Sequence, residues 1–272
     1  MPQTARAMPP RARRPDPYRR RRRASRALLG LTPSEFAVLR RLSSPQKIQA
    51  FLFGLKQNFE IGGQSCRPVR WVLRERRAHC IEGAMLAACA LWVHGEPPLV
   101  MDMRAERDYD HVIALFRRNG RWGAISKTNG IALRWRDPVY RSLRELAMSY
   151  FHEYCNKLDH KTLREYSVPI DLRRVDPRLW VAGEKNVWEV PEHLEAQRHY
   201  RLASARQLRA LVRRDPFERR MGGMLQYRRP RVESRRPRRG TTASPARSSA
   251  PRRAGARRPP PGILRTRARR GS

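Results

Sequence analysis

The sequence predicts an α+β fold in which one buried, cysteine-bearing helix packs on an antiparallel sheet. Three observations predict it: a long apolar segment without proline, two short apolar runs that follow it, and a hairpin turn after the second run. The apolar segment is Cys80–Val93, which indicates a central core helix. Gly95 and the prolines at 97 and 98 are expected to end this helix.

The strands of the sheet are predicted directly after that helix. Apolar runs at 99–103 and 111–116 are typical of buried strands. Asn119 and Gly120 are a strong signal for a two-residue hairpin turn, which predicts a third strand over 121–126. The order of helix, strand and hairpin favours an antiparallel sheet rather than a parallel one.

Shorter helices are expected before the central one. The Thr-Pro-Ser-Glu segment at 32–35 begins an amphipathic stretch, and Gly62 and Gly63 end a second stretch that begins at 44–45. A third helix is predicted over 69–77. The inward residues of the last two are Ile48, Phe51, Leu52, Leu55, Val69, Val72 and Leu73.

Further helices are expected towards the C-terminus. Asp137 and Pro138 are predicted to begin a long helix that reaches about Cys155, and shorter helices are predicted near 192–200 and 204–214. The inward set of the long helix is Leu143, Leu146, Ala147, Tyr150, Phe151 and Tyr154.

Positive charge is concentrated at the two ends of the chain. Residues 1–27 hold ten arginines and one aspartate, and residues 228–272 hold sixteen arginines and one glutamate. The ends therefore carry +9 and +15 of the formal net charge of +36, which leaves +12 for residues 28–227. Both ends lack the apolar residues that would offset the entropy of ordering, which predicts a disordered leader, a central domain with a helical extension, and a disordered tail.

Such tails predict at most weak, salt-sensitive binding to phosphates, anionic lipids or acidic proteins, and a solvated tail without a partner is an alternative. We find no secretory signal, and the longest apolar run, 84–93, is half a membrane span, which predicts a cytoplasmic protein. The four cysteines, Cys66, Cys80, Cys89 and Cys155, suggest neither a disulfide framework nor a zinc site. No cofactor or metal is expected, because no phosphate-binding glycine loop or calcium loop is recognisable.

Cys80 is the candidate nucleophile. A cysteine reacts as the thiolate, and a helix N-terminus beside a histidine lowers the pKa of its thiol. Cys80 falls on the first turn of the predicted central helix, where free backbone N–H groups favour negative charge and could bind an oxyanion. His111, on a following strand, is the candidate base.

These residues resemble the core of the transglutaminase-like family, in which a cysteine begins a buried helix, a Gly-x-Pro ends it, a histidine lies on one strand and an aspartate on the next. The matching segments occur in the same order: Cys80 with Ala84, Gly95-Glu96-Pro97, Asp110-His111-Val112 and Gly120-Arg121-Trp122. The resemblance covers about residues 45–130. It implies a papain-like fold and acyl transfer from a protein or peptide carboxamide through a thioester.

Three features of the sequence depart from the family pattern. Ser126 falls where the family has its aspartate, so the serine hydroxyl or the nearby Asn129 is expected to fix Nδ1 of His111 without supplying a charge. Ile113 replaces a tryptophan, and Pro98 with Leu99 replaces an arginine. Gln64 is a candidate second oxyanion donor, whereas His79 is expected to cap the helix or lie at the surface.

The sequence leaves three functions open. The first is a cysteine-dependent amidase, protease or acyltransferase, with Cys80, His111, Ser126 and Asn129 as its site. The second is a papain-like binding module that has lost catalysis. The third is a non-specific nucleic-acid-binding protein that acts through its basic tails. The acidic loop formed by Asp102, Glu106, Asp108 and Asp110 is expected either to bind a cationic substrate or to be a solvated turn.

Overall fold

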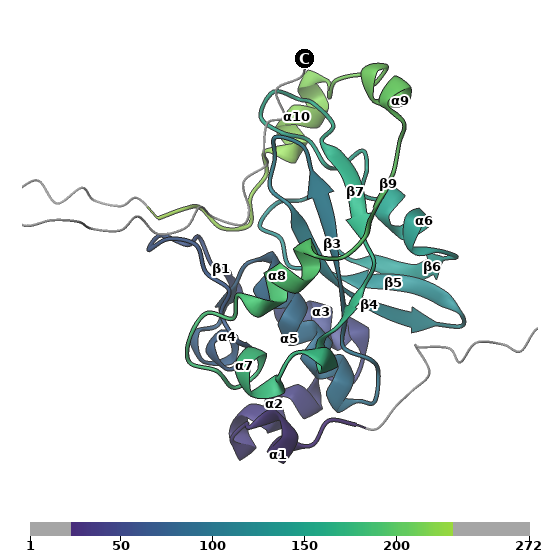
Figure 1. The fold of residues 1–272 in the computed structure, drawn as a ribbon. Helices are drawn as coiled ribbons and strands as arrows, with labels where there is room; N and C mark the ends of the chain where they lie inside the picture. Colours follow the sequence, from purple (N-terminus) through teal and green to yellow (C-terminus); the bar gives the residue numbers. More distant parts are fainter. Residues whose placement is uncertain (1–22, 231–272) are drawn as a thin grey trace, which may run out of the picture.

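A computed structural model describes residues 23–230, and the arginine-rich ends at 1–22 and 231–272, where tails are predicted, lie outside the described residues. The described part is a mixed α+β fold built on an antiparallel sheet and one buried helix (Figure 1). The first helix, α1 (Arg26–Leu29), straddles the boundary expected after residue 27. Ala24 before it is already buried in the core.

The helices before the sheet begin at the capping signals of the sequence. Thr32 accepts the N–H of Glu35 while the Glu35 carboxylate accepts the N–H of Thr32, which fixes the start of α2 (Pro33–Arg41). Ser44 caps α3 (Pro45–Phe53) through its hydroxyl, which accepts the N–H of Lys47. The next helix is α4 (Val69–Glu75).

The central helix α5 (Cys80–Val93) has the bounds predicted from the sequence. Its residues from Ile81 to Val93 are all buried, because other elements pack around it on every side. A short parallel pair, β1 (Lys56–Gln57) and β2 (Arg77–Ala78), holds the chain immediately before its first turn.

The main sheet is larger than the three strands predicted. Its order is β6-β5-β4-β3-β7-β9, and β8 also pairs with β3. All of its pairings are antiparallel. The strands are β3 (Leu99–Ala105), β4 (His111–Arg118), β5 (Arg121–Ile125), β6 (Arg136–Tyr140), β7 (Leu163–Ser167), β8 (Ile170–Asp171) and β9 (His199–Arg201).

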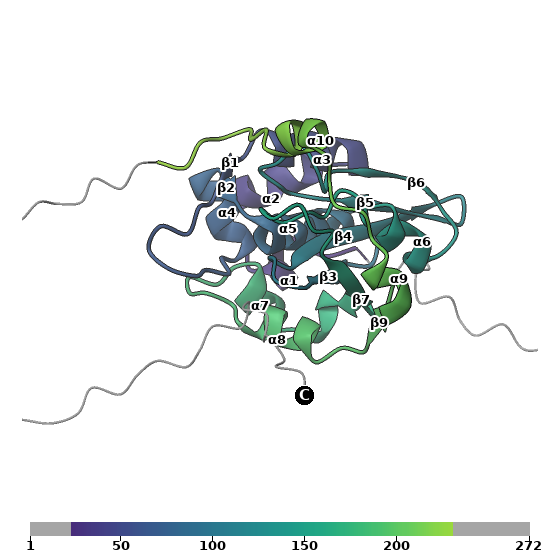
Figure 2. The same cartoon turned by 90° about the horizontal axis from the view of Figure 1, so that it is seen from above.

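The sheet lies between two apolar layers. On one face Val100, Val112 and Ala114 pack with α5, and on the other face Met101 and Ile113 pack with the segment around α6 (Leu143–Met148). Figure 2 shows α5 and α6 on different sides of the strands. Because both faces are covered, β3 and β4 have continuous apolar runs instead of an alternating pattern.

The prediction of a long helix over 137–155 is wrong. Residues 136–140 form the edge strand β6, where Pro138 is tolerated because an edge strand leaves part of its backbone without a ladder partner. The helix is limited to α6, and turns follow it. Those turns still bury Tyr150, Phe151 and Tyr154, so the helical periodicity identified the core residues but not the backbone conformation.

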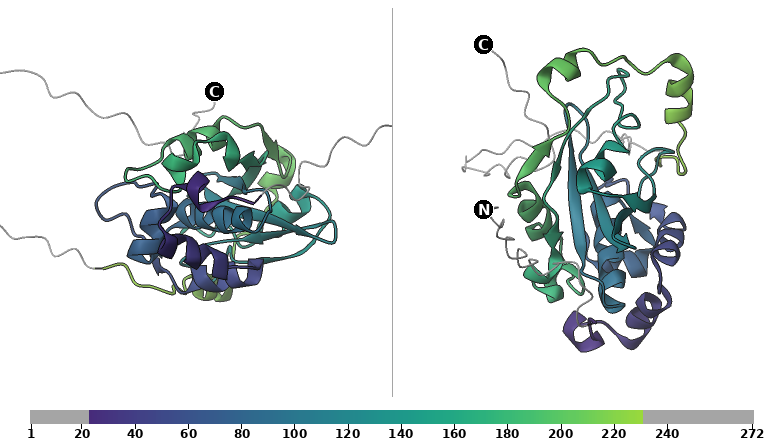
Figure 3. Two further views of the ribbon diagram at one scale, coloured as in Figure 1. Left: turned by 90° about the horizontal axis from the view of Figure 1, so that it is seen from below. Right: turned by 90° about the vertical axis from the view of Figure 1, so that its right-hand side faces the viewer.

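The C-terminal elements also differ from the prediction. The helix expected near 192–200 is α8 (Glu189–Glu195) followed by β9, and the one expected at 204–214 is only α9 (Ala205–Arg209). Two further helices, α7 (Pro177–Trp180) and α10 (Pro216–Gly222), were not predicted. Figure 3 (right) shows the yellow-green segment of α9 and α10 at the opposite end of the molecule from the purple N-terminal helices, whereas α7 packs beside α1.

Candidate active site

Cys80 lies where the sequence places it, at the first residue of α5. The helix begins here because the Glu82 side chain accepts the backbone N–H of His79 at 3.0 Å, which occupies one of the donors that a helix start leaves without a partner. The Cys80 side chain is only partly buried, whereas the rest of α5 is buried. Cys80 is therefore the one residue of α5 that keeps some exposure.

His111 is the first residue of β4, and Ser126 follows directly after β5. The two strands are paired, with Ala114 opposite Ile125, so the sheet brings the side chains together. His111 Nε2 lies 2.8 Å from the Ser126 hydroxyl, and both residues are buried.

The hydrogen-bond network settles the tautomer of His111. The Ser126 hydroxyl donates its one proton to the carbonyl of Leu133 at 2.5 Å, so it accepts the bond from His111 Nε2–H. We expected Nδ1 to be the fixed nitrogen, but it is Nε2, so Nδ1 is the ring nitrogen that remains for the hydrogen bond between His111 and Cys80. Gln49 holds Ser126 in place through two bonds to its backbone, of 2.8 and 2.9 Å.

The environment makes Cys80 an acidic thiol. Burial alone would raise the pKa of this thiol, but hydrogen bonds from His111 and His79, together with their positive charge, lower the pKa to about 5. The N-terminal end of α5 favours negative charge in the same direction. Cys80 is therefore suited to be a thiolate nucleophile at neutral pH.

His79 contributes more to this site than the sequence indicated. Its ring is buried, with Nδ1 3.9 Å from the Cys80 sulfur and Nε2 2.9 Å from the carbonyl of Ser65. Glu82 lies 3.4 Å from the same Nε2 and is fully buried. The spacing of His79 and Glu82, three residues apart at a helix start, is the one signal in the sequence for this arrangement.

Asn129 is not brought to His111. Its side-chain amide donates to the carbonyl of Tyr227 and accepts the N–H of Tyr227, both at 2.9 Å. Asn129 thus fastens the segment after α10 to the loop that follows Ser126. Gln64 is exposed on the loop before α4.

The acidic loop is paired within the protein rather than free for a cationic ligand. Asp102 lies 3.3 Å from His199, Glu106 pairs with Arg164, and Asp108 accepts the hydroxyl of Thr162. Asp110 accepts the N–H of Ala105 at 2.7 Å. Burial and the nearby Asp102 raise the pKa of Asp110 to about 7.

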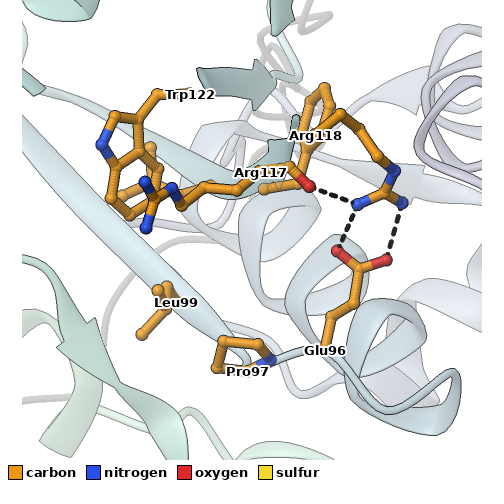
Figure 4. Close-up of a pocket in the computed structure, with 8 residues that line it drawn as sticks. Glu96, Pro97, Leu99, Arg117, Arg118 and Trp122 are labelled. Carbon is orange, nitrogen blue, oxygen red and sulfur yellow. Dashed lines mark hydrogen bonds and ion pairs between the residues drawn. The ribbon is translucent and has the colours of Figure 1, made fainter. Parts of the chain in front are cut away.

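A pocket lies at the other end of the same helix. It is lined by Glu96, Pro97, Leu99 and Trp122 among others, and Arg118 forms a two-pronged ion pair with Glu96 at its edge (Figure 4). Since α5 has 14 residues and a helix rises about 1.5 Å per residue, this pocket is about 20 Å from Cys80. It belongs to the Gly-x-Pro end of the helix and does not include the candidate nucleophile.

Within residues 23–230 we find no cluster of three or more histidine, cysteine, aspartate or glutamate side chains arranged to hold a metal ion. In the same range no helix is both long and apolar enough to cross a membrane. No protein-family model matches the chain, and no curated protein sequence matches it.

Proposed function

We propose that this chain is a cysteine-dependent acyl-transfer or amide-hydrolysing protein of the transglutaminase-like, papain-related type. The observation that carries the proposal is the acidic thiol of Cys80 at the start of α5, beside an imidazole that Ser126 holds in one tautomer. With a pKa of about 5, this thiol is a thiolate at neutral pH, which is the form that attacks a carbonyl carbon.

The reaction follows from the position of each group. The sulfur of Cys80 attacks the carbonyl carbon of a protein or peptide carboxamide, and the carbonyl electron pair moves onto the oxygen. Backbone N–H groups at the start of α5 stabilise that oxyanion. His111, protonated at Nδ1, gives its proton to the leaving amine as the carbon–nitrogen bond breaks, which leaves a thioester on Cys80.

The second half of the reaction regenerates the thiolate. His111 takes a proton from the incoming water or amine, which attacks the thioester and releases Cys80. Water makes the protein an amidase or protease, and an amine makes it a transferase. Both outcomes use the same residues up to the thioester.

The fold supports this proposal at the level of its architecture. A cysteine at the start of a buried helix, followed by a histidine and its orienting group on adjacent antiparallel strands, is the order that the family resemblance implies. The papain-like assignment is part of the proposal, since the α+β class alone is shared by many functions.

One observation favours a rival function, a papain-like binding module without catalysis. Ser126 occupies the position where the family has a carboxylate, and a hydroxyl brings no negative charge to stabilise the imidazolium of His111. A module of this kind would bind a peptide segment beside Cys80 and leave its carboxamide intact.

Alkylation by iodoacetamide tests the thiolate. In a Cys155→Ser background, with Cys80→Ser as the blank, we expect the rate to rise with pH around a midpoint near 5, far below the value of about 8.5 for a simple thiol. A midpoint near 8.5 would remove the basis for the enzyme.

Ammonia release from an N-blocked glutamine peptide then separates the enzyme from the module. We expect His111→Ala to lower this rate by roughly 10²- to 10⁴-fold and Cys80→Ser to abolish it. A thiolate with a low midpoint but no release from this peptide or from a panel of peptide amides would favour the binding module.

The arginine-rich ends are proposed to bind polyanions weakly and without sequence preference. Deletion of residues 228–272 should then abolish retention of DNA on a column at low salt. Retention that survives this deletion would instead assign DNA binding to the rest of the chain.

A further inference from the structure

His79 is placed between a nucleophile and a carboxylate. Its φ and ψ of −102° and −169° are extended, so its side chain does not follow the direction of the α5 side chains. The ring is buried, and each of its nitrogens faces a different partner. Nδ1 faces the sulfur of Cys80 at 3.9 Å.

The other nitrogen of this ring must carry a proton. Nε2 lies 2.9 Å from the carbonyl oxygen of Ser65, which can only accept a hydrogen bond. Carboxylate oxygens of Glu82 and Glu60 lie 3.4 and 3.6 Å from the same nitrogen. With Nε2 protonated, one further proton is shared between Nδ1 and the sulfur, and its position decides whether Cys80 is a thiol or a thiolate.

Glu82 decides the position of that proton. Its carboxylate is fully buried and accepts hydrogen bonds from Asn58, the Ser65 hydroxyl and the backbone N–H of Arg67. A carboxyl group whose oxygens accept several hydrogen bonds is ionised, and a buried carboxylate needs a positively charged partner. His79 is the side chain within ion-pair distance of Glu82 in the described residues.

We propose that His79 is a second catalytic imidazole, which as an imidazolium holds Cys80 as a thiolate, and that Glu82 is the positioning residue that keeps His79 charged. The inference rests on the proposed function, because it concerns the same nucleophile. The negative charge that an aspartate beside His111 would supply is absent, because Ser126 offers His111 only a hydroxyl. Glu82 supplies a carboxylate to the site, beside His79. The thiolate then persists when His111 has given up its proton.

The charges around the ring support this division of roles. Burial alone would lower the pKa of His79, but its hydrogen bonds with Cys80 and Glu82 and their negative charges raise it well above its usual value. Glu60 faces the ring from the loop after β1, and the thiol of Cys66 lies near the same carboxylates. Across Cys80, His111 is the other imidazole that lowers the pKa of the thiol, and Asp110 is a further acid near it.

The test is the pH midpoint of iodoacetamide alkylation at Cys80 in the full chain. We use the midpoint and not the rate at one pH. A substitution that raises the pKa of the thiol lowers the fraction of thiolate but makes each thiolate more nucleophilic, so the two effects on the rate partly cancel. We expect His79→Gln to raise the midpoint by at least about one pH unit, and Glu82→Gln to raise it by a smaller amount. His111→Ala should leave a midpoint that is still below neutral pH.

His94→Gln is the matched control. His94 caps the opposite end of α5 and bonds the carbonyl of Leu39 at 3.2 Å, so its loss should leave the midpoint of Cys80 unchanged. A His79→Gln midpoint equal to that of the parent protein would overturn the inference and leave the proposed function intact. A parent midpoint near that of a simple thiol would overturn both.

A second measurement needs no substitution at His79, whose loss could prevent folding. In full-length protein labelled with ¹⁵N at its seven histidines, we expect an imidazole that has both nitrogens protonated at about pH 8 and keeps them protonated in the His111→Ala variant. Spectra of His111→Ala and His199→Gln variants exclude the buried His111 and the largely covered His199 ring from the assignment. If every imidazole is neutral at that pH, His79 is not the charged partner of Cys80.

Discussion

The two cysteines of α5 lie on the same helix and have opposite chemistry. Cys89 is fully buried in the middle of the helix, and burial raises the pKa of its thiol far above the usual value. Cys80 is at the first turn, where two imidazoles reverse the effect of burial and lower the pKa to about 5. The comparison shows that burial alone makes a cysteine inert, and that the helix start becomes reactive through the partners that meet it there.

Alkylation at pH 7 gives the largest expected difference between these two cysteines. In the folded protein, iodoacetamide should modify Cys80 at least about a thousand times faster than Cys89, because Cys89 has neither thiolate character nor access. Peptide mass spectrometry measures both rates in one sample. Both cysteines should react alike once the protein is unfolded in guanidinium, and comparable rates in the folded protein would contradict the comparison.

The second largest expected difference between the two cysteines is their effect on how the free energy of unfolding changes with pH. The folded protein holds the Cys80 proton only below about pH 5, whereas the unfolded chain holds it up to the usual thiol pKa of about 8.5. Between these values the unfolded chain binds more protons, so this group makes the free energy of unfolding rise with pH. Its contribution is complete above pH 9 and is lost as the pH falls through 5.

Urea denaturation of the parent protein and of Cys80→Ser at about pH 5.5, 7 and 8.5 measures this effect. The difference in unfolding free energy between the two proteins should grow in favour of the parent as the pH increases. In Cys89→Ala, the matched control, the difference from the parent should stay constant, because both states keep the Cys89 proton over most of this window. A constant difference for Cys80→Ser would show that its thiol is not acidic in the fold.

The sequence predicts some elements of the fold better than others. The bounds of α5 follow from its apolar, proline-free composition, and the strands that carry His111 and Ser126 follow from a hairpin turn close in sequence. By contrast, β7 pairs with β3 from more than fifty residues away, and local patterns hold no information on such a partner. The edge strand β6 was assigned to a helix because its apolar neighbours repeat with helical spacing.

The residues of the candidate site were identified from the sequence only in part. Cys80 and His111 were identified from residue types at known positions of elements, and Ser126 from the next strand. His79 was not, because the argument that adjacent helical residues point apart assumed that both lie within the helix. His79 is the extended residue before it, so its ring turns towards the Cys80 sulfur.

Gly83→Ala tests how closely the helix start must approach the sheet. A Cβ at Gly83 would lie 2.5 Å from Cβ of Lys127, the residue after Ser126, so α5 and the end of β5 would have to separate. We expect a loss of about 1–3 kcal/mol in the free energy of unfolding and a higher alkylation midpoint at Cys80. Gly62→Ala is the control, since no atom lies within 4 Å of its new Cβ. Equal stability of the two variants would contradict this close approach.

Asn129→Ala should have the smallest effect, and it separates two residues that the sequence offered for one role. The Asn129 side chain bonds the backbone of Tyr227 and not His111, so its loss should cost about 1 kcal/mol and leave the Cys80 midpoint unchanged. Ser126→Ala removes the acceptor of His111 Nε2–H and should raise the midpoint, because the imidazole is then free to turn away from the sulfur. A midpoint that moves in Asn129→Ala but not in Ser126→Ala would mean that the C-terminal segment, rather than the end of β5, sets the orientation of His111.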